Sequence, residues 1–171
     1  MREIYRREKR KIRFSKWMYM VIVWCTYLMR LMADIPSPYS MHYEERKDVL
    51  LPFNEGWLIF MGIFLLFIVN NELFFIKEQG KQVYVMEKYM IVPIHQKKLY
   101  NLRVRIFFET ILCFVIGTCG VYTVVTIAND YIFSPMVLFL SMIKLLCILV
   151  LLMILILVFE SRSQGKILQK K

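Results

Sequence analysis

The sequence lacks the short motifs that mark most enzymes. It has neither the GxxxxGK(S/T) loop that holds nucleotide phosphates nor the GxSxG and HExxH patterns of hydrolases and metalloproteases. Glycine is scarce, with six residues, and the two histidines, His42 and His95, lie far apart along the chain. These absences predict that the chain is not an enzyme and binds no cofactor of its own.

Paired cysteines and clustered histidines are missing as well. The chain has four cysteines and no CxxC pair: Cys25, Cys113, Cys119 and Cys147. His42 stands alone near two glutamates, without the repeated spacing that a metal site requires. We therefore expect no metal and no disulfide, and we expect the cysteines to pack as small buried hydrophobic residues.

Long apolar runs make up most of the chain. Of its 171 residues 58% are hydrophobic, and its mean hydropathy is +0.51. Four runs approach or exceed the roughly 20 residues with which a helix crosses a bilayer: about 17–33, 57–76, 104–128 and 135–159. Because backbone groups in lipid have to be bonded internally, we predict an all-α fold, a polytopic membrane protein with four transmembrane helices.

Basic residues predict how these spans are oriented. Nineteen of the 23 lysines and arginines lie before Trp17, between Lys77 and Arg105, or after Phe159. The positive-inside rule then places both termini and the middle loop in the cytosol, which agrees with an even number of spans. A basic inner face on anionic lipids accounts for the net charge of +10, so we expect membrane lipids as partners and no nucleic acid.

The same pattern divides the chain into three parts. Residues 1–16 are predicted to form a cytoplasmic basic amphipathic helix, with a shapeless charged tail as the alternative. Residues 17–159 form the transmembrane domain, including the cytoplasmic loop 77–103, and residues 160–171 form a cytoplasmic basic tail.

Polar residues within the predicted spans are candidates for a pathway. Asn70, Asn71 and Glu72 lie near the inner end of the second span, and Glu109 lies near the inner end of the third. These two carboxylates belong to a polar cluster at an inner gate, or they reach interfacial water or pair with nearby arginines and lysines. Lys144 lies nine residues into the fourth span, so we expect it to face a protein interior, a water-filled cavity or an acid.

The third span also contains small and hydroxylated residues. Gly117 and Gly120 stand among three threonines, Thr118, Thr123 and Thr126. Such residues let helices approach closely and form hydrogen bonds across the contact, although no GxxxG pair is present.

The most distinctive segment lies in the middle loop and reads EKYMIVPIHQKKLYNLR from Glu87 to Arg103. Pro93 suits the first turn of a helix, and the basic residues that follow suit its end. Leu99 and Leu102 are three residues apart and share a face. We predict a short helix with an apolar face and a basic rim, which either docks on a cytosolic protein or rests on the membrane surface.

This segment resembles one found between the second and third spans of the permease subunits of ABC-2-type bacterial ABC transporters. There, an acidic residue and a few hydrophobic residues lead into Leu-Pro-Ile-Ser-(Arg/Lys), and residues 87–100 have that order, with His95 where the family usually has Ser or Thr. The basic N-terminus looks like the family's connecting helix. Such permeases normally have six spans, so four spans suggest a reduced or split form.

The resemblance implies a membrane subunit that couples a cytosolic ABC ATPase to export of a peptide, lipid or drug-like amphiphile across a bacterial plasma membrane. ATP and Mg would bind to the ATPase, and a second permease copy or paralogue would complete the transporter. The docking residues would be Pro93, Ile94, His95, Lys97, Lys98, Leu99 and Leu102. The alternative is a non-transporting membrane interaction protein, such as an immunity or sensor subunit.

Overall fold

The computed structural model describes residues 13–35, 50–78, 81–84 and 96–168, with side chains for 15–35, 50–75 and 100–159. These parts form four helices and a two-stranded antiparallel hairpin. The elements are α2 (Arg13–Ala33), α4 (Glu55–Phe74), β1 (Phe75–Glu78), β2 (Lys81–Tyr84), α6 (Gln96–Ala128) and α7 (Pro135–Leu168).

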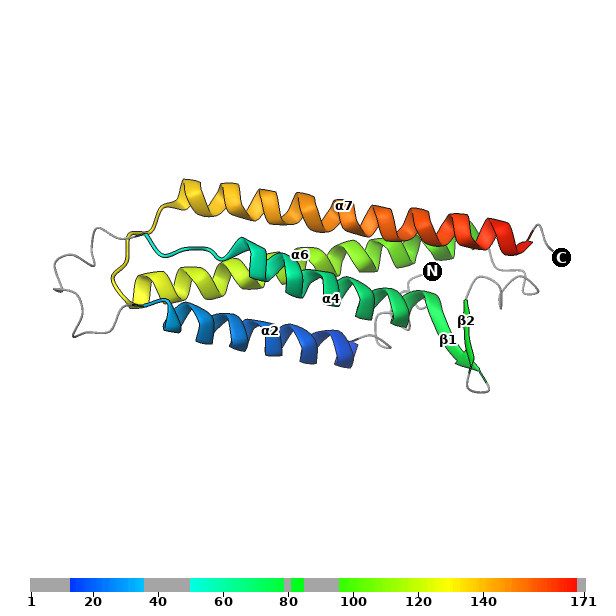
Figure 1. Ribbon diagram of the computed structural model, residues 1–171, viewed down its shortest axis with the longest axis horizontal. Coiled ribbons are helices and arrows are strands. Elements are labelled where there is room, and N and C mark those ends of the chain that lie inside the picture. The colour runs from blue at the N-terminus through cyan, green and yellow to red at the C-terminus, as the bar shows by residue number, and fades with distance from the viewer. Residues whose placement is uncertain (1–12, 36–49, 79–80, 85–95, 169–171) are drawn as a thin grey trace.

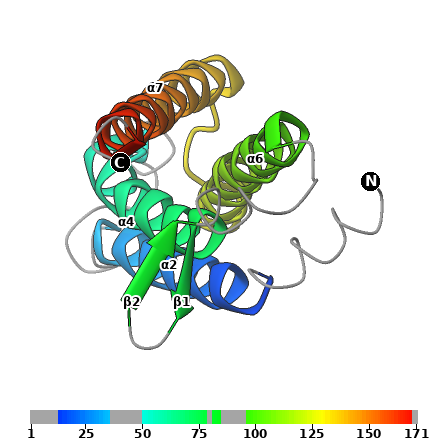
Figure 2. The same cartoon turned by 90° about the vertical axis from the view of Figure 1, so that its right-hand side faces the viewer.

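The helices pack side by side as an elongated bundle. α2 and α6 run in one direction, and α4 and α7 run in the other (Figure 1). α4 and α6 contact each other and both outer helices, so α2 and α7 lie on opposite sides of them (Figure 2). The hairpin, the start of α6 and the end of α7 lie at one end of the bundle, here called the hairpin end. The connection from α6 to α7 lies at the opposite end.

Three of the described helices are long and apolar enough to cross a membrane, which indicates a membrane protein. They are the helices over Glu55–Phe74, Tyr100–Ala128 and Pro135–Phe159. α2, which corresponds to the predicted first span, is not among them. Its sequence includes Lys16 and Arg30 together with tryptophans and tyrosines, and these side chains make it less apolar than the other three helices.

The hairpin was not predicted. The second span was expected to reach residue 76, but the helix ends at Phe74 and the chain turns into β1. Phe75 pairs with Tyr84 and Ile76 pairs with Val83 across the two strands. Aromatic and β-branched residues favour strands, so two short runs of them on either side of a glycine pair with each other before the next helix begins.

The structure describes part of each predicted terminal segment, and it describes that part as helix. α2 begins at Arg13 and includes the last residues of the predicted helix 1–16, of which residues 1–12 lie outside the described part. α7 continues to Leu168, so most of the predicted tail 160–171 extends the last span as a helix.

Glycines mark close approaches between helices. A Cβ at Gly117 of α6 would overlap the indole of Trp24 in α2, and one at Gly62 of α4 would lie 2.5 Å from Cδ2 of Leu149 in α7. Gly120, by contrast, has no neighbouring atom within 4 Å of such a Cβ. The expected close packing in the third span is therefore found at Gly117.

The threonines and cysteines behave differently from expectation. The hydroxyls of Thr118, Thr123 and Thr126 each donate a 2.8 Å hydrogen bond to a carbonyl of their own helix. These hydrogen bonds lie within α6 and do not join it to a neighbouring helix.

Cys119 is buried as expected, but Cys25 and Cys147 are exposed on the outside of the bundle.

Candidate functional site

Tyrosine hydroxyls join the helices at the end opposite the hairpin. Tyr27 of α2 donates a 2.7 Å hydrogen bond to the carbonyl of Phe53, and Tyr122 of α6 donates one of 2.7 Å to the carbonyl of Leu51. Both acceptors lie in the non-helical residues 50–54, here called the strap, which lead into α4. Leu51 and Phe53 are buried between the helices.

Aromatic rings surround these hydrogen bonds. Tyr27 stacks on Trp57 of α4, with ring centroids 5.8 Å apart and planes at 16°. Phe53 meets Tyr122 edge-on at 5.2 Å. Such pairs add to the stability gained from burying their area. The strap is thereby fixed to three helices at once.

The strap occupies space that a longer α4 would otherwise fill. Because Gly62 of α4 faces Leu149 of α7, the start of α4 at Glu55 is level with about Met142. That point is seven residues into α7, roughly 10 Å at 1.5 Å per residue. Figure 1 shows α4 beginning nearer the middle of the bundle than α7 does.

Lys144 forms an ion pair with Glu55 at this level. Its Nζ contacts Oε2 of Glu55, which joins α7 to the first turn of α4. Ser141, one turn earlier in α7, also hydrogen-bonds to the Glu55 carboxylate. The side chain of Lys144 is 61% exposed and that of Glu55 is 25% exposed, so the pair lies on the outside of the bundle and not in its interior.

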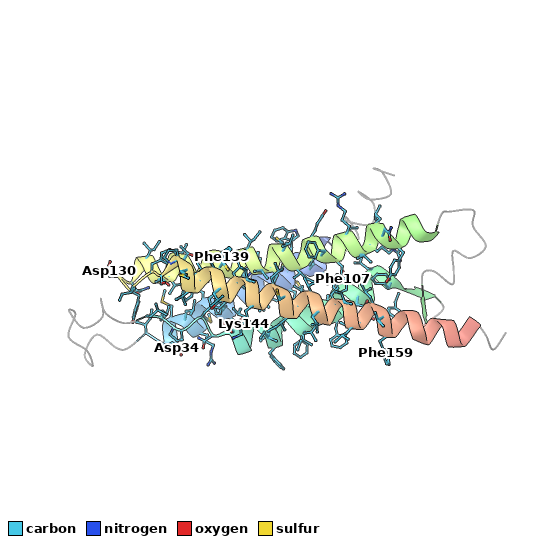
Figure 3. The ribbon with its side chains drawn as sticks, turned by 90° about the horizontal axis from the view of Figure 1, so that it is seen from above. Asp34, Phe107, Asp130, Phe139, Lys144 and Phe159 are labelled. Atoms are coloured by element: carbon cyan, nitrogen blue, oxygen red, sulfur yellow. The ribbon has the colours of Figure 1, made fainter. Side chains whose placement is uncertain are left out.

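A second polar contact lies beside the pair. Asn54, immediately before Glu55, adopts a left-handed conformation with φ 54° and ψ 45°. Its Nδ2 donates a 2.6 Å hydrogen bond to Oδ2 of Asp34, just past the end of α2. Figure 3 shows Asp34 near the end of the bundle and Lys144 further along α7. We call these five residues the Glu55 cluster: Asp34, Asn54, Glu55, Ser141 and Lys144.

The predicted polar residues near the hairpin end differ in burial and in their hydrogen-bond partners. Asn70 is buried and Asn71 is exposed. One carboxylate oxygen of Glu72 is buried, and within the described part of the chain it has no hydrogen-bond partner. Glu109 pairs with Arg105 on its own helix, with Nε and Oε1 3.2 Å apart. Glu109 is therefore held by an i,i+4 pair on the bundle surface.

The predicted docking segment is continuous with a span. Residues 96–103 form the first two turns of the 33-residue helix α6, where the sequence suggested a separate short helix. Pro93, Ile94 and His95 lie outside the described residues, and of Lys97, Lys98 and Leu99 only the backbone is described. Leu102 is half-buried against the bundle core.

Arg103 was expected on the basic rim of the docking helix. Its side chain is only 1% exposed, among the most buried in the described part of the protein. α6 turns Arg103 fully and Leu102 partly into the bundle, which leaves little of the Arg103 side chain for a cytosolic protein to contact.

Sequence reasoning missed three residues that organise the site. Glu55 sits just before the second predicted span, and only the register between α4 and α7 identifies it as the partner of Lys144. Tyr27 and Tyr122 lie within apolar runs, where a tyrosine is ordinary. The sequence offered one indication of their role, a phenol hydroxyl within a predicted span. A buried hydroxyl needs a hydrogen-bond acceptor.

The described residues contain no group of three or more His, Cys, Asp or Glu side chains placed to hold a metal ion. Comparison with known proteins finds no family model, curated protein or solved structure that matches the chain.

Proposed function

We propose that this chain is the membrane subunit of an ABC-2-like transporter, which couples a cytosolic ATPase to export of a peptide, lipid or drug-like amphiphile. The proposal rests on the resemblance of residues 87–100 to the permease segment. The observation that carries it is the continuity of α6, which joins residues 96–99 to a membrane-length helix without a break.

A continuous helix supports a mechanical role. At 1.5 Å per residue, the 33 residues of α6 extend roughly 50 Å. An ATPase that held its first turn would move it as a rigid body, and α6 contacts α2, α4 and α7. In this account the docking surface is formed by Lys97, Lys98 and Leu99, together with residues 93–95.

The apolar packing of the bundle supports a path outside it. The described core consists mainly of aliphatic and aromatic side chains, and Lys144 and Glu55 pair on its surface. A polar or amphiphilic substrate therefore travels along a surface shared with a second permease copy or paralogue. In the full account α2 is the first of four spans, residues 1–12 belong to a basic helix on the membrane, and both termini are in the cytosol of a bacterium.

The same packing favours one alternative. A non-transporting membrane interaction protein, such as an immunity or sensor subunit, needs no substrate path. A closed core with its intramembrane lysine satisfied by an acid of the same chain fits that role. The two functions differ in their need for an ATPase.

Co-purification tests the choice. A tagged chain is extracted from its native membrane in mild detergent, and the proteins that accompany it are identified by mass spectrometry. The comparison variants are Leu99→Asp, in the proposed docking surface, and Asn101→Asp, at an exposed position of the next turn. A P-loop ATPase present with the wild type and with Asn101→Asp, but lost with Leu99→Asp, supports the transporter. Its absence from all three samples supports the alternative.

A further inference from the structure

We propose that water reaches the Glu55 cluster from the end opposite the hairpin, although Lys144 lies at a depth where α7 faces lipid. This inference does not depend on the proposed function, since it concerns where the membrane boundary lies on one side of the bundle.

The Glu55 cluster lies some distance along α7 from the start of that helix. α7 is apolar from Pro135 onward and belongs to the membrane-length stretch that ends at Phe159. Residues nearer its start than Lys144 are large, apolar and open to the outside, with Met136 83% and Leu140 69% exposed. Such side chains favour lipid, so the apolar belt on α7 begins well before the ion pair.

The ion pair of Lys144 and Glu55 is open to the outside of the bundle. Lys144 is 61% exposed and Glu55 is 25% exposed, so the bundle itself does not enclose them. Charged side chains at membrane depth are costly in hydrocarbon and face a protein interior or water. Since the described part of the bundle does not enclose this pair, water is the surrounding that fits it.

The strap leads directly into Glu55. The strap is non-helical, and its carbonyls at Leu51 and Phe53 are hydrogen-bonded by tyrosines. At membrane depth, irregular backbone is tolerated where it is buried in protein or lines water. The strap meets this condition because Leu51 and Phe53 are buried, and since residues 50–54 are not helical, α4 begins only at Glu55.

The polar groups of the Glu55 cluster form a continuous series across three helices. Asp34 and Asn54 connect the end of α2 to Glu55, and Ser141 and Lys144 continue from there onto α7. α4 starts level with the middle of the cluster. Water that enters from the end opposite the hairpin therefore passes one polar group after another on its way to Lys144. The apolar belt is consequently shorter along α4 than along α7.

Cysteine labelling in sealed membrane vesicles tests the proposal. The four native cysteines are replaced by alanine, and Lys144→Cys is compared with Ile143→Cys, which is 40% exposed and one residue away in depth but on another face of α7. Ile132→Cys, in the exposed connection from α6 to α7, marks the accessible side. The probe is a membrane-impermeant maleimide, which reacts with the thiolate that forms in water.

Water at the cluster predicts that the thiol of the Lys144→Cys variant reacts from the same side as that of Ile132→Cys. It should also react about tenfold or more faster than the thiol of Ile143→Cys, because only a thiol in contact with water can ionise. Equal rates for Ile143→Cys and Lys144→Cys, whether slow or fast, overturn the proposal, since depth alone then decides access.

A second measurement leaves the ion pair intact. Native Lys144 in the wild-type chain is treated with a membrane-impermeant amine-reactive ester, and its modification is measured by mass spectrometry before and after detergent is added. Modification in intact vesicles supports access by water. Modification only after detergent means that lipid or another chain covers Lys144, and the proposal fails.

Discussion

The indole ring of Trp24 in α2 occupies the space that a side chain at Gly117 of α6 would need. A Cβ built at Gly117 overlaps the ring atoms Cε2 and Cζ2 of Trp24. This contact packs α2, which is not among the helices apolar enough to cross a membrane, against α6, which is. The position of α2 in the bundle therefore depends on the absence of a side chain at residue 117.

Gly117→Ala is expected to destabilise the protein by roughly 1–3 kcal/mol, since a methyl group forced into a packed contact displaces its neighbours. Gly120→Ala in the same helix is the control. A Cβ there meets nothing within 4 Å, and alanine favours the helix, so stability should stay unchanged or rise slightly. Unfolding of the two variants in detergent, followed by circular dichroism, makes the comparison. Equal loss in both would contradict the Trp24 contact as the cause, because a Cβ at Gly120 has no neighbour to displace.

Tyr122→Phe and Tyr27→Phe should each lower stability by about 1–3 kcal/mol, because each leaves a strap carbonyl buried without a partner. Tyr19→Phe is the matched control. Its hydroxyl donates a 2.8 Å bond to the carbonyl of Met61, which lies within α4 and keeps its helical hydrogen bond. A smaller loss for Tyr19→Phe, measured by thermal unfolding in detergent, is the expected result. Similar losses of stability for all three variants would contradict the claim that the hydrogen bonds to the strap carbonyls matter more than the one to Met61.

The Glu55–Lys144 pair should show coupling in a double-mutant cycle. Glu55→Leu and Lys144→Leu each leave one charge unpaired, whereas the double variant leaves none. We expect the double variant to be more stable than the sum of the single changes predicts, by about 1 kcal/mol, since the pair is partly exposed. Additive changes would mean that the two side chains are solvated independently.

Leu102→Asp should destabilise the bundle by at least about 1 kcal/mol, since it places a carboxylate against the apolar core. Asn101→Asp, next to it on the exposed side, should have little effect. Unfolding measurements on the isolated chain, with no ATPase present, separate packing from docking. If Leu102→Asp is as stable as the wild type, Leu102 faces outward and returns to the docking surface.

The apolar runs predicted much of the fold, because the length of an apolar run is enough to identify a membrane-spanning helix. α6 and α7 span the predicted residues 104–128 and 135–159, and three helices have the length and composition of spans. The sequence could not predict how far each helix continues past the apolar residues. α6 begins at Gln96 and α7 ends at Leu168, since a helix extends through polar residues when nothing interrupts it.

The candidate site was predicted only in part, for a geometric reason. A lysine in an apolar run indicates that it needs a partner, and this followed from the sequence at Lys144. Its partner Glu55 lies 89 positions earlier in the chain, and only the register between two packed helices brings them together. Likewise, Arg103 is buried because it lies on the side of α6 that packs against the bundle. Its charge alone would predict an exposed position.

The central claim, that a cytosolic ATPase docks on the first turn of α6, is tested most directly by site-specific photocrosslinking in cells. A photoreactive amino acid is placed at Lys98 or Leu99, and at Phe108, which is exposed on the same helix further along. The account predicts that positions 98 and 99 form a covalent product containing a P-loop ATPase and that position 108 does not. No ATPase product at either of the first two positions would contradict it.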